Sequence, residues 1–244
     1  MSARYLYIFP HPDDESFGPA AAIHGQLEKG HEVFLLTLTR GGATKQRHKL
    51  GLSVEEMGEV RYKEMVEVEK RLGLTGMTVL DFPDSGLKEM NPREIEKAVR
   101  EHVEKIKPQI VVSYPVHGIS GFHDHIVAHS AVKRLYLDPK ADGADWLERL
   151  AFITLPDSGL PTWGEDGAPR MKLTGESLID AVIHLSPEDI EAMKRSLAAY
   201  TTYQETIEKS GVVEKIGDRL YFEIFGEDHD PVLTDLAGAI PVLT

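Results

Sequence analysis

The chain alternates apolar strand candidates with capped helices, and this alternation narrows the folds that are open to it. The strand candidates are short runs, rich in β-branched and aromatic residues, that end at proline, glycine or polar residues. The first four lie at residues 5–9, 33–38, 77–82 and 109–114. Helices between them are expected to start near Ser16, after Ser53 and after Asn91. This order predicts an α/β fold, a Rossmann-like three-layer sandwich with a mostly parallel sheet and helices on both faces.

The rest of the chain continues the pattern at a length that suits one domain. Further strands are expected at residues 150–155, 179–184 and 220–225, the last of which would close the sheet. A polar, glycine-containing loop is expected at residues 39–51. A chain of 244 residues predicts a single domain over residues 1–244, with residues 226–244 as a candidate C-terminal tail. The apolar side chains of this tail would contact another subunit or pack on their own domain.

Composition excludes several classes of function. The chain has 27 Lys and Arg against 40 Asp and Glu, and its net charge of −13 disfavours nucleic acid and anionic membranes as partners. It has no cysteine, so His, Asp and Glu are the residues that could bind a metal. No signal peptide is evident and no apolar run approaches the ~18 residues of a membrane span, so we expect a cytoplasmic protein.

Two groups of acids and histidines follow the first and fourth predicted strands. His11, Asp13 and Asp14 come directly after the first strand, and the stretch PVHGISGFHDH at residues 115–125 follows the fourth. Open α/β sheets bind ligands at the carboxyl ends of their strands, so the two groups would meet if these strands are neighbours. Together they supply a His, Asp and His set, which suits a catalytic zinc that keeps one position open.

The two adjacent aspartates would need different tasks. One carboxylate would bind the metal, while its neighbour, turned the other way by the backbone, could accept a proton as general base. Pro10 and Pro12 flank His11 and stiffen this loop, because each fixes its own φ and restricts the residue before it. A rigid loop would hold the ligands in place before a metal binds.

The stretch PHPDDE at residues 10–15 resembles the signature of the PIG-L / LmbE-type zinc-dependent N-deacetylases. These enzymes remove acetyl groups from N-acetylglucosamine-type substrates, including sugar conjugates of the mycothiol and bacillithiol pathways. The resemblance extends from Arg4 to about Phe225. It implies an amidohydrolase with one zinc ion per chain and an amino-sugar substrate. Members of the family often assemble, so it also implies a homo-oligomer.

The resemblance assigns roles to the first motif and to part of the second. It implies that His11 and Asp14 bind zinc and that Asp13 is the general base. The second family motif, usually Gly-His-Pro-Asp-His, falls on residues 121–125 and makes His125 the third ligand.

One position departs from that second motif. Phe122 stands where the family has a histidine that polarises the carbonyl or protonates the leaving amine. His123 is the first candidate to replace it and His117 the second, and a mechanism that relies on zinc alone is the third.

The helix after Ser53 carries two charged residues on its apolar face. Arg61 and Glu64 lie three residues apart, in step with Met57 and Val68, so we expect both to face inward. Two charged side chains that face inward need partners that compensate their charges. This indicates either a structural ion pair or a substrate anchor. The resemblance favours contact between Arg61 and the substrate, and Asp84 is a further candidate, for a sugar hydroxyl.

Other functions and ligands are also compatible with these residues. Adjacent aspartates with a His-Asp-His triplet would suit a dinuclear, manganese-dependent phosphoesterase. Phe122 motivates a second alternative, a sugar- or metal-binding protein that has lost catalysis. His129, four residues beyond His125, could mimic a metal ligand but is interpreted as an ordinary helix histidine. The first strand is not followed by a glycine-rich turn, which argues against a dinucleotide-dependent oxidoreductase.

Overall fold

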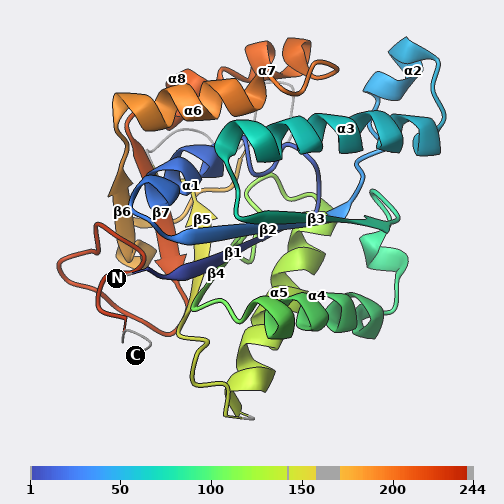
Figure 1. Cartoon of the computed structure of the whole chain (residues 1–244). Helices are drawn as coiled ribbons and strands as arrows, with labels where there is room; N and C mark the ends of the chain where they lie inside the picture. The colour runs from blue at the N-terminus through green and yellow to red at the C-terminus, as the bar shows by residue number, and fades with distance from the viewer. Residues whose placement is uncertain (1, 142, 158–170, 241–244) are drawn as a thin grey trace.

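The computed structural model describes residues 2–141, 143–157 and 171–240, and within these ranges the chain forms one seven-stranded sheet (Figure 1). The strands are β1 (Arg4–Phe9), β2 (Glu32–Thr39), β3 (Gly76–Phe82), β4 (Ile110–Ser113), β5 (Arg149–Thr154), β6 (Ala181–His184) and β7 (Arg219–Ile224). Their order in the sheet is β3-β2-β1-β4-β5-β7-β6. The first five strands pair in parallel, and β7 pairs antiparallel with both β5 and β6. The predicted α/β fold class is therefore confirmed.

The last strand does not lie at the edge of the sheet, where a closing strand would be. Instead β7 enters between β5 and β6, and β6 forms the edge. In this position both sides of β7 make ladder hydrogen bonds, and its alternate residues Leu220, Phe222 and Ile224 are buried.

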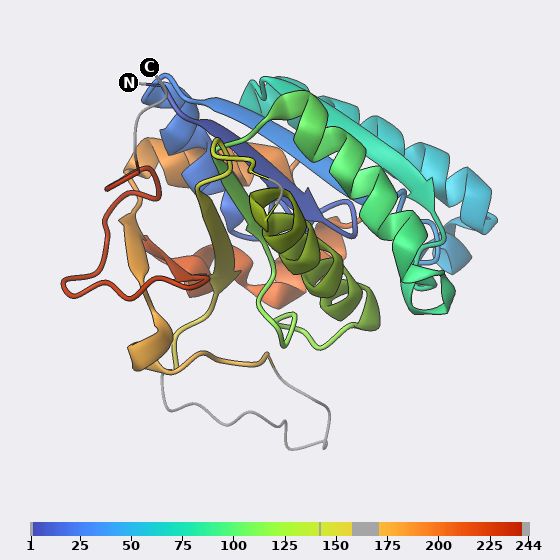
Figure 2. The ribbon, with the colours of Figure 1, turned by 90° about the horizontal axis from the view of Figure 1, so that it is seen from below.

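Helices cover both faces of the sheet (Figures 1 and 2). One face carries α1 (Pro19–Glu28), α3 (Val54–Leu72) and α6 (Pro187–Leu197), and the other carries α4 (Pro92–Ile106) and α5 (His123–Ala141). The shorter elements are α2 (Gln46–Leu50), α7 (Gln204–Ser210), α8 (Val212–Ile216), and the 3-10 turns η1 (Leu87–Glu89) and η2 (Glu176–Leu178). None of the described helices combines the length and the apolar run that crossing a membrane requires.

Two local predictions differ from the structure. The first helix begins at Pro19 rather than near Ser16, because Gly18 has a φ of +129°, outside the helical region, and the residues before it form turns. Within the predicted loop at residues 39–51, the structure has the short helix α2.

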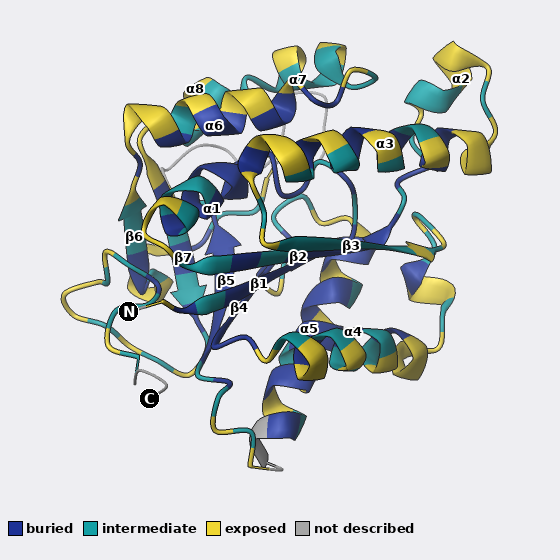
Figure 3. Ribbon diagram, viewed as in Figure 1, coloured by how far each residue is buried: buried dark blue, intermediate teal, exposed yellow. Residues whose placement is uncertain are grey.

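The central strand β1 contributes to two hydrophobic cores. Tyr5, Tyr7 and Phe9 pack on the side of α1, α3 and α6, while Leu6 and Ile8 pack on the side of α4 and α5. All five side chains are buried, and Figure 3 shows that exposed residues gather on the outer faces of the helices. A strand that is buried on both faces reads as a continuous apolar run, which is why β1 is visible in the sequence.

The segment after β7 packs on its own domain as far as residue 240. Arg149 is buried and donates to the carboxylate of Glu227 and to the carbonyl oxygens of Leu236 and Gly238. Leu233 continues the hydrogen bonding at the free side of β6. Residues 241–244 of the candidate tail lie outside the described residues.

Candidate metal centre and active site

The two predicted groups meet at the carboxyl edge of the sheet. The strands β1 and β4 are parallel neighbours, with Tyr7 opposite Val112, so the loop after β1 and the segment after β4 leave the sheet side by side. The first loop carries His11 and Asp14, and the second segment leads to His125 in the first turn of α5.

Three side chains form a compact cluster at this edge. His11, Asp14 and His125 each offer a ligand atom, and these atoms all lie within 4.8 Å of one another. Nε2 of His125 lies 3.4 Å from Oδ1 of Asp14, and Nδ1 of His11 lies 3.6 Å from Oδ2. Asp14 and His125 are buried, so the protein fixes the cluster before any ligand arrives.

Each imidazole is oriented through its other nitrogen. Nε2 of His11 lies 3.2 Å from Oδ2 of Asp124 and 3.3 Å from Oδ1 of Asp84. Nδ1 of His125 donates to the carbonyl oxygen of Gly118 at 2.9 Å. In the neutral rings these contacts favour the tautomer whose lone pair lies on the nitrogen that faces Asp14.

Asp14 is fixed by two donors. The hydroxyl of Tyr114 donates to its Oδ1 at 2.7 Å, and the backbone N–H of His11 donates to its Oδ2 at 2.9 Å. Burial alone would raise the pKa of Asp14, but His125, His11 and the Tyr114 hydroxyl outweigh it and lower this pKa. The carboxylate is therefore ionised and ready to bind a cation.

The donor set of the cluster fits a divalent metal such as zinc. Two imidazole nitrogens and one carboxylate oxygen are typical of catalytic zinc sites with an open position. The surroundings also attract positive charge. Burial would lower the pKa of His11, but Asp124, Asp14 and Asp84 raise it to about 10.

The first aspartate of the motif, Asp13, has a different partner from Asp14. Oδ2 of Asp13 accepts a hydrogen bond from Nη2 of Arg61 at 2.7 Å, and the same nitrogen donates to the carbonyl oxygen of Pro12 at 2.8 Å. Burial raises the pKa of Asp13 to about 6, against the opposing charge of Arg61. Asp13 and Asp14 thus differ in both partner and pKa, as two carboxylates with separate tasks require.

Arg61 is almost completely buried. Its side chain is 2% exposed, and its guanidinium lies 4.0 Å from the ring centre of Tyr203. Glu64 is also buried, as the helix pattern predicts, but it accepts hydrogen bonds from Thr201 and Thr202 rather than from Arg61. The expected Arg61–Glu64 pair is replaced by two separate sets of contacts, because each side chain reaches a different loop.

Asp84 lies beside His11 rather than in an open part of the site. Its Oδ2 accepts the backbone N–H of Ala43 at 2.6 Å, while Oδ1 faces His11. Both carboxylate oxygens therefore have partners within the protein. Its predicted contact with a sugar hydroxyl stays a prediction.

The candidate histidines lie in different surroundings. His123 is exposed on the first residue of α5, next to Phe122, which is 65% exposed. In His117 both ring nitrogens are engaged: Nδ1 accepts the N–H of Ile119 and Nε2 contacts Oγ1 of Thr174. His129 donates from Nδ1 to the carbonyl oxygen of Tyr114, which ties α5 to the end of β4.

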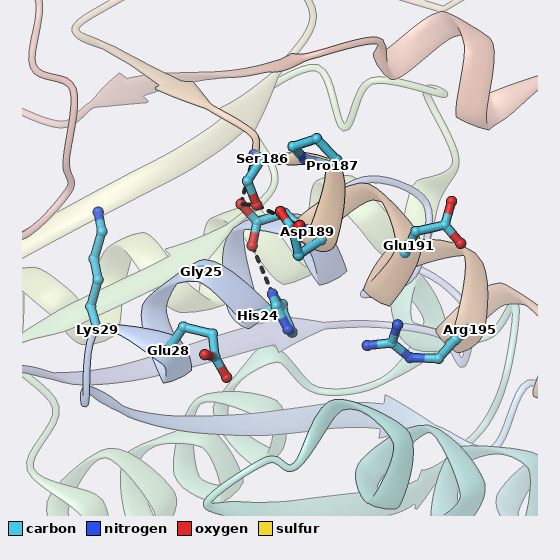
Figure 4. A pocket seen from close by; sticks show the side chains of 10 residues that line it. His24, Gly25, Glu28, Lys29, Ser186, Pro187, Asp189, Glu191 and Arg195 are labelled. Carbon is cyan, nitrogen blue, oxygen red and sulfur yellow. Dashed lines mark hydrogen bonds and ion pairs between the residues drawn. The ribbon is translucent and has the colours of Figure 1, made fainter.

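A surface hollow of about 650 Å³ lies elsewhere in the molecule (Figure 4). It is formed by the end of α1 and the start of α6, where Nδ1 of His24 lies 2.7 Å from Oδ1 of Asp189. The end of α1 leads into β2, so this hollow belongs to the amino edge of the parallel strands. It is separate from the candidate metal centre at the carboxyl edge.

Three residues of the site were not identified from the sequence, namely Tyr114, Asp124 and Tyr200. Tyr114 closes the fourth apolar run, and Asp124 stands inside the His-Asp-His triplet, so each had a local signal. Tyr200 has no such signal, because it reaches the site only through the packing of α6 and the turn that follows it.

The fold and the site together define a class of protein, a three-layer α/β fold with a His-Asp-His cluster that could bind a metal at the carboxyl edge of its sheet. The sequence profile of the PIG-L family, described as GlcNAc-PI de-N-acetylase, matches residues 6–136, which is more than half of the chain. The chain belongs to this family, and the resemblance seen in its motifs is confirmed.

Individual relatives that are similar in sequence support the membership of this chain in the PIG-L family. A "1D-myo-inositol 2-acetamido-2-deoxy-alpha-D-glucopyranoside deacetylase" of Thermomonospora curvata is 32% identical over 176 residues, covering 62% of this chain and 59% of the relative. A protein of the same name from Mycolicibacterium smegmatis is 25% identical over 97% of this chain and 92% of its own. For three similar relatives the match spans only 46–59% of their length.

A solved structure supports the fold. The zinc-inhibited form of teicoplanin deacetylase Orf2 superimposes with a TM-score of 0.68, covering 90% of this chain and 97% of that one, at 14% identity. At this identity the likeness extends to the fold alone. The relatives named here are deacetylases, so the phosphoesterase and binding-protein alternatives gain no support from them.

Proposed function

We propose that the protein is a zinc-dependent hydrolase that removes the N-acetyl group from an N-acetylglucosamine-type sugar or conjugate. The observation that carries this proposal is the preformed cluster of His11, Asp14 and His125 with the carboxylate of Asp13 held separately beside it. Family membership and the printed names of the relatives support the choice of an N-acetylated amino sugar.

His11, Asp14 and His125 would hold the zinc ion. When bound, zinc polarises the acetamide carbonyl as a Lewis acid and lowers the pKa of water toward ~7. The contacts of Asp124 and Gly118 to the two imidazoles keep both rings in the metal-binding tautomer.

Asp13 would act as the general base. Its carboxylate takes a proton as water attacks the carbonyl carbon, and a pKa of about 6 keeps it ionised near neutral pH. As the C–N bond breaks, the protonated carboxyl returns this proton to the departing nitrogen. The products are acetic acid and the amine, the acid's proton passes to the amine to give acetate and an ammonium group, and Asp13 is again ionised.

The residue that assists the carbonyl oxygen or the amine is proposed to be His123. It stands in the first turn of α5 together with the ligand His125, and it is exposed to solvent and so accessible to a substrate. His117 is the second candidate, but its ring nitrogens already have partners. Substrate contact by Arg61 would need its buried guanidinium to become accessible.

The test of this function combines metal content with acetate release. Purified protein is analysed for bound metal and then assayed against N-acetylglucosamine and several of its conjugates, with and without a chelator. The proposal expects about one zinc ion per chain and acetate release that chelation abolishes. A protein with bound zinc that releases no acetate from any of these compounds would contradict it.

A cytoplasmic location and a homo-oligomeric state stay predictions.

A further inference from the structure

The backbone of Asp13 has an unusual conformation that something must hold. Its φ is +88°, in the region that residues with a side chain rarely adopt. The backbone N–H of Asp13 donates to the hydroxyl oxygen of Tyr200 at 2.8 Å. This hydrogen bond joins the loop after β1 to a residue that follows α6, far along the chain.

The hydroxyl of Tyr200 is itself directed by a buried carboxylate. It donates to Oε1 of Glu15 at 2.6 Å, and Oγ of Ser16 donates to the same oxygen at 2.6 Å. A phenol has one proton, so donation to Glu15 leaves its oxygen to accept the N–H of Asp13. The contacts therefore form a directed chain from the N–H of Asp13 through the Tyr200 hydroxyl to the carboxylate of Glu15.

This arrangement is unfavourable as a purely structural device. Glu15 and Tyr200 are fully buried, and Oε2 of Glu15 has no hydrogen-bond partner among the described residues. A buried polar atom without a partner opposes folding and calls for an explanation. Only Tyr200 stands between Glu15 and Asp13 in this chain of hydrogen bonds. A role in holding Asp13 would therefore explain why the buried carboxylate is present.

We propose that Tyr200 and Glu15 are positioning residues that hold Asp13 in its reactive conformation. Tyr200 fixes the backbone of Asp13 and Arg61 fixes its carboxylate, and the Arg61 guanidinium lies 5.5 Å from the centre of the Tyr200 ring. The two supports therefore lie close together and act on one residue, Tyr200 on its backbone and Arg61 on its carboxylate. The inference rests on the proposed function, in which Asp13 is the base.

A second buried tyrosine provides a matched control. The hydroxyl of Tyr7 is also fully buried, and it is hydrogen-bonded to the side chain of Gln26 in the same core as Tyr200. Tyr7→Phe and Tyr200→Phe each remove one bonded hydroxyl and leave the ring in place. They differ in that only Tyr200 contacts Asp13.

The experiment compares both variants and the wild type as metal-loaded full chains. For Tyr200→Phe we expect kcat for acetate release to fall at least tenfold, with KM and the metal content per chain unchanged. For Tyr7→Phe we expect the melting temperature to fall about as much as in Tyr200→Phe. Its kcat should nevertheless stay within twofold of the wild-type value. In an Asp13→Asn background, Tyr200→Phe should lower kcat no further, because both changes act through the same carboxylate.

Several outcomes would overturn the inference. It fails if the wild type is active and Tyr200→Phe keeps a normal kcat, or if the two tyrosine variants lose kcat equally. Should Tyr200→Phe not fold, Glu15→Gln replaces it, and an unchanged kcat in that variant has the same meaning. A metal-loaded wild type that releases no acetate would overturn the proposed function and the inference together.

Discussion

Asp124 accepts a hydrogen bond from Nε2 of His11 across 3.2 Å, although the two residues belong to different motifs of the chain. The same carboxylate accepts the backbone N–H groups of Ser85 and Leu87, and it is almost fully buried. One side chain thus connects a proposed metal ligand, the turn after β3 and the first turn of α5. Asp124 orients His11 from the side that faces away from Asp14.

Replacing Asp124 should therefore weaken metal binding. In Asp124→Asn the amide can no longer offer a charged acceptor to His11, and we expect zinc affinity to fall about 10- to 100-fold. Competition with a chromophoric chelator measures this change. Asp81 is exposed and lies near the end of β3. Its variant Asp81→Asn is the control, and its zinc affinity should equal that of the wild type. Equal affinities for all three proteins would rule out the orienting role.

Removing the carboxylate charge of Asp13 should abolish turnover while metal stays bound. Asp13→Asn keeps the size of the side chain but cannot accept a proton, so kcat should fall by about 10²–10⁴. Elemental analysis should still find the wild-type amount of zinc, because Asp13 points toward Arg61 rather than into the cluster. Near-normal turnover in this variant would show that another group is the base.

Arg61 offers a test between a role in supporting Asp13 and direct contact with substrate. In Arg61→Met the buried carboxylate of Asp13 loses its charged partner, and we expect stability to fall by about 3 kcal/mol or more. Because Arg61 contacts Asp13 and is buried, kcat should fall with little change in KM. Thermal denaturation and steady-state kinetics measure the two effects. A rise in KM at constant kcat would instead indicate a substrate anchor.

The pair of Arg149 and Glu227 should make stability depend on pH. Burial alone would raise the pKa of Glu227, but Arg149 and His229 outweigh it and lower this pKa. The stabilisation is therefore complete above the unfolded pKa of about 4.3 and is lost as the pH falls through the lower folded value. Glu227→Gln should lower stability by about 2 kcal/mol at pH 7 and reduce the loss on acidification below pH 5.

Melting curves between pH 7 and pH 3 would measure this dependence. The exposed Glu101 on α4 gives the control Glu101→Gln, which should follow the wild-type curve. If Glu227→Gln and the wild type lose the same stability on acidification, other carboxylates govern the acid transition.

The sequence predicts those parts of the fold and site that depend on local patterns. The run Tyr5–Phe9 is apolar on both faces, so β1 could be placed, and the polar residues that follow it could be assigned to the carboxyl edge. The strand order could not be derived in full. No sequence pattern shows whether β7 lies at an edge of the sheet or between two other strands. Its position depends on the twist and packing of the finished sheet.

Residues that support the site are harder to predict than the ligands. Glu15 looks like one more polar residue of its motif, and its contact with Tyr200 depends on how the segment after α6 packs against the loop after β1. Arg61 could be placed on the inner side of α3 by periodicity, but the residue it would meet there could not be known. Contacts over long sequence separations are set by tertiary packing, which no local pattern records.

The proposed ligands come from two places that are about a hundred residues apart in the chain, the loop after β1 and the start of α5. An ion held by His11, Asp14 and His125 would act as a cross-link between them that only the folded state can form. Its binding energy would add to the free energy of unfolding in proportion to the logarithm of free metal concentration. Metal supply would thus influence the stability of the fold as well as its proposed activity.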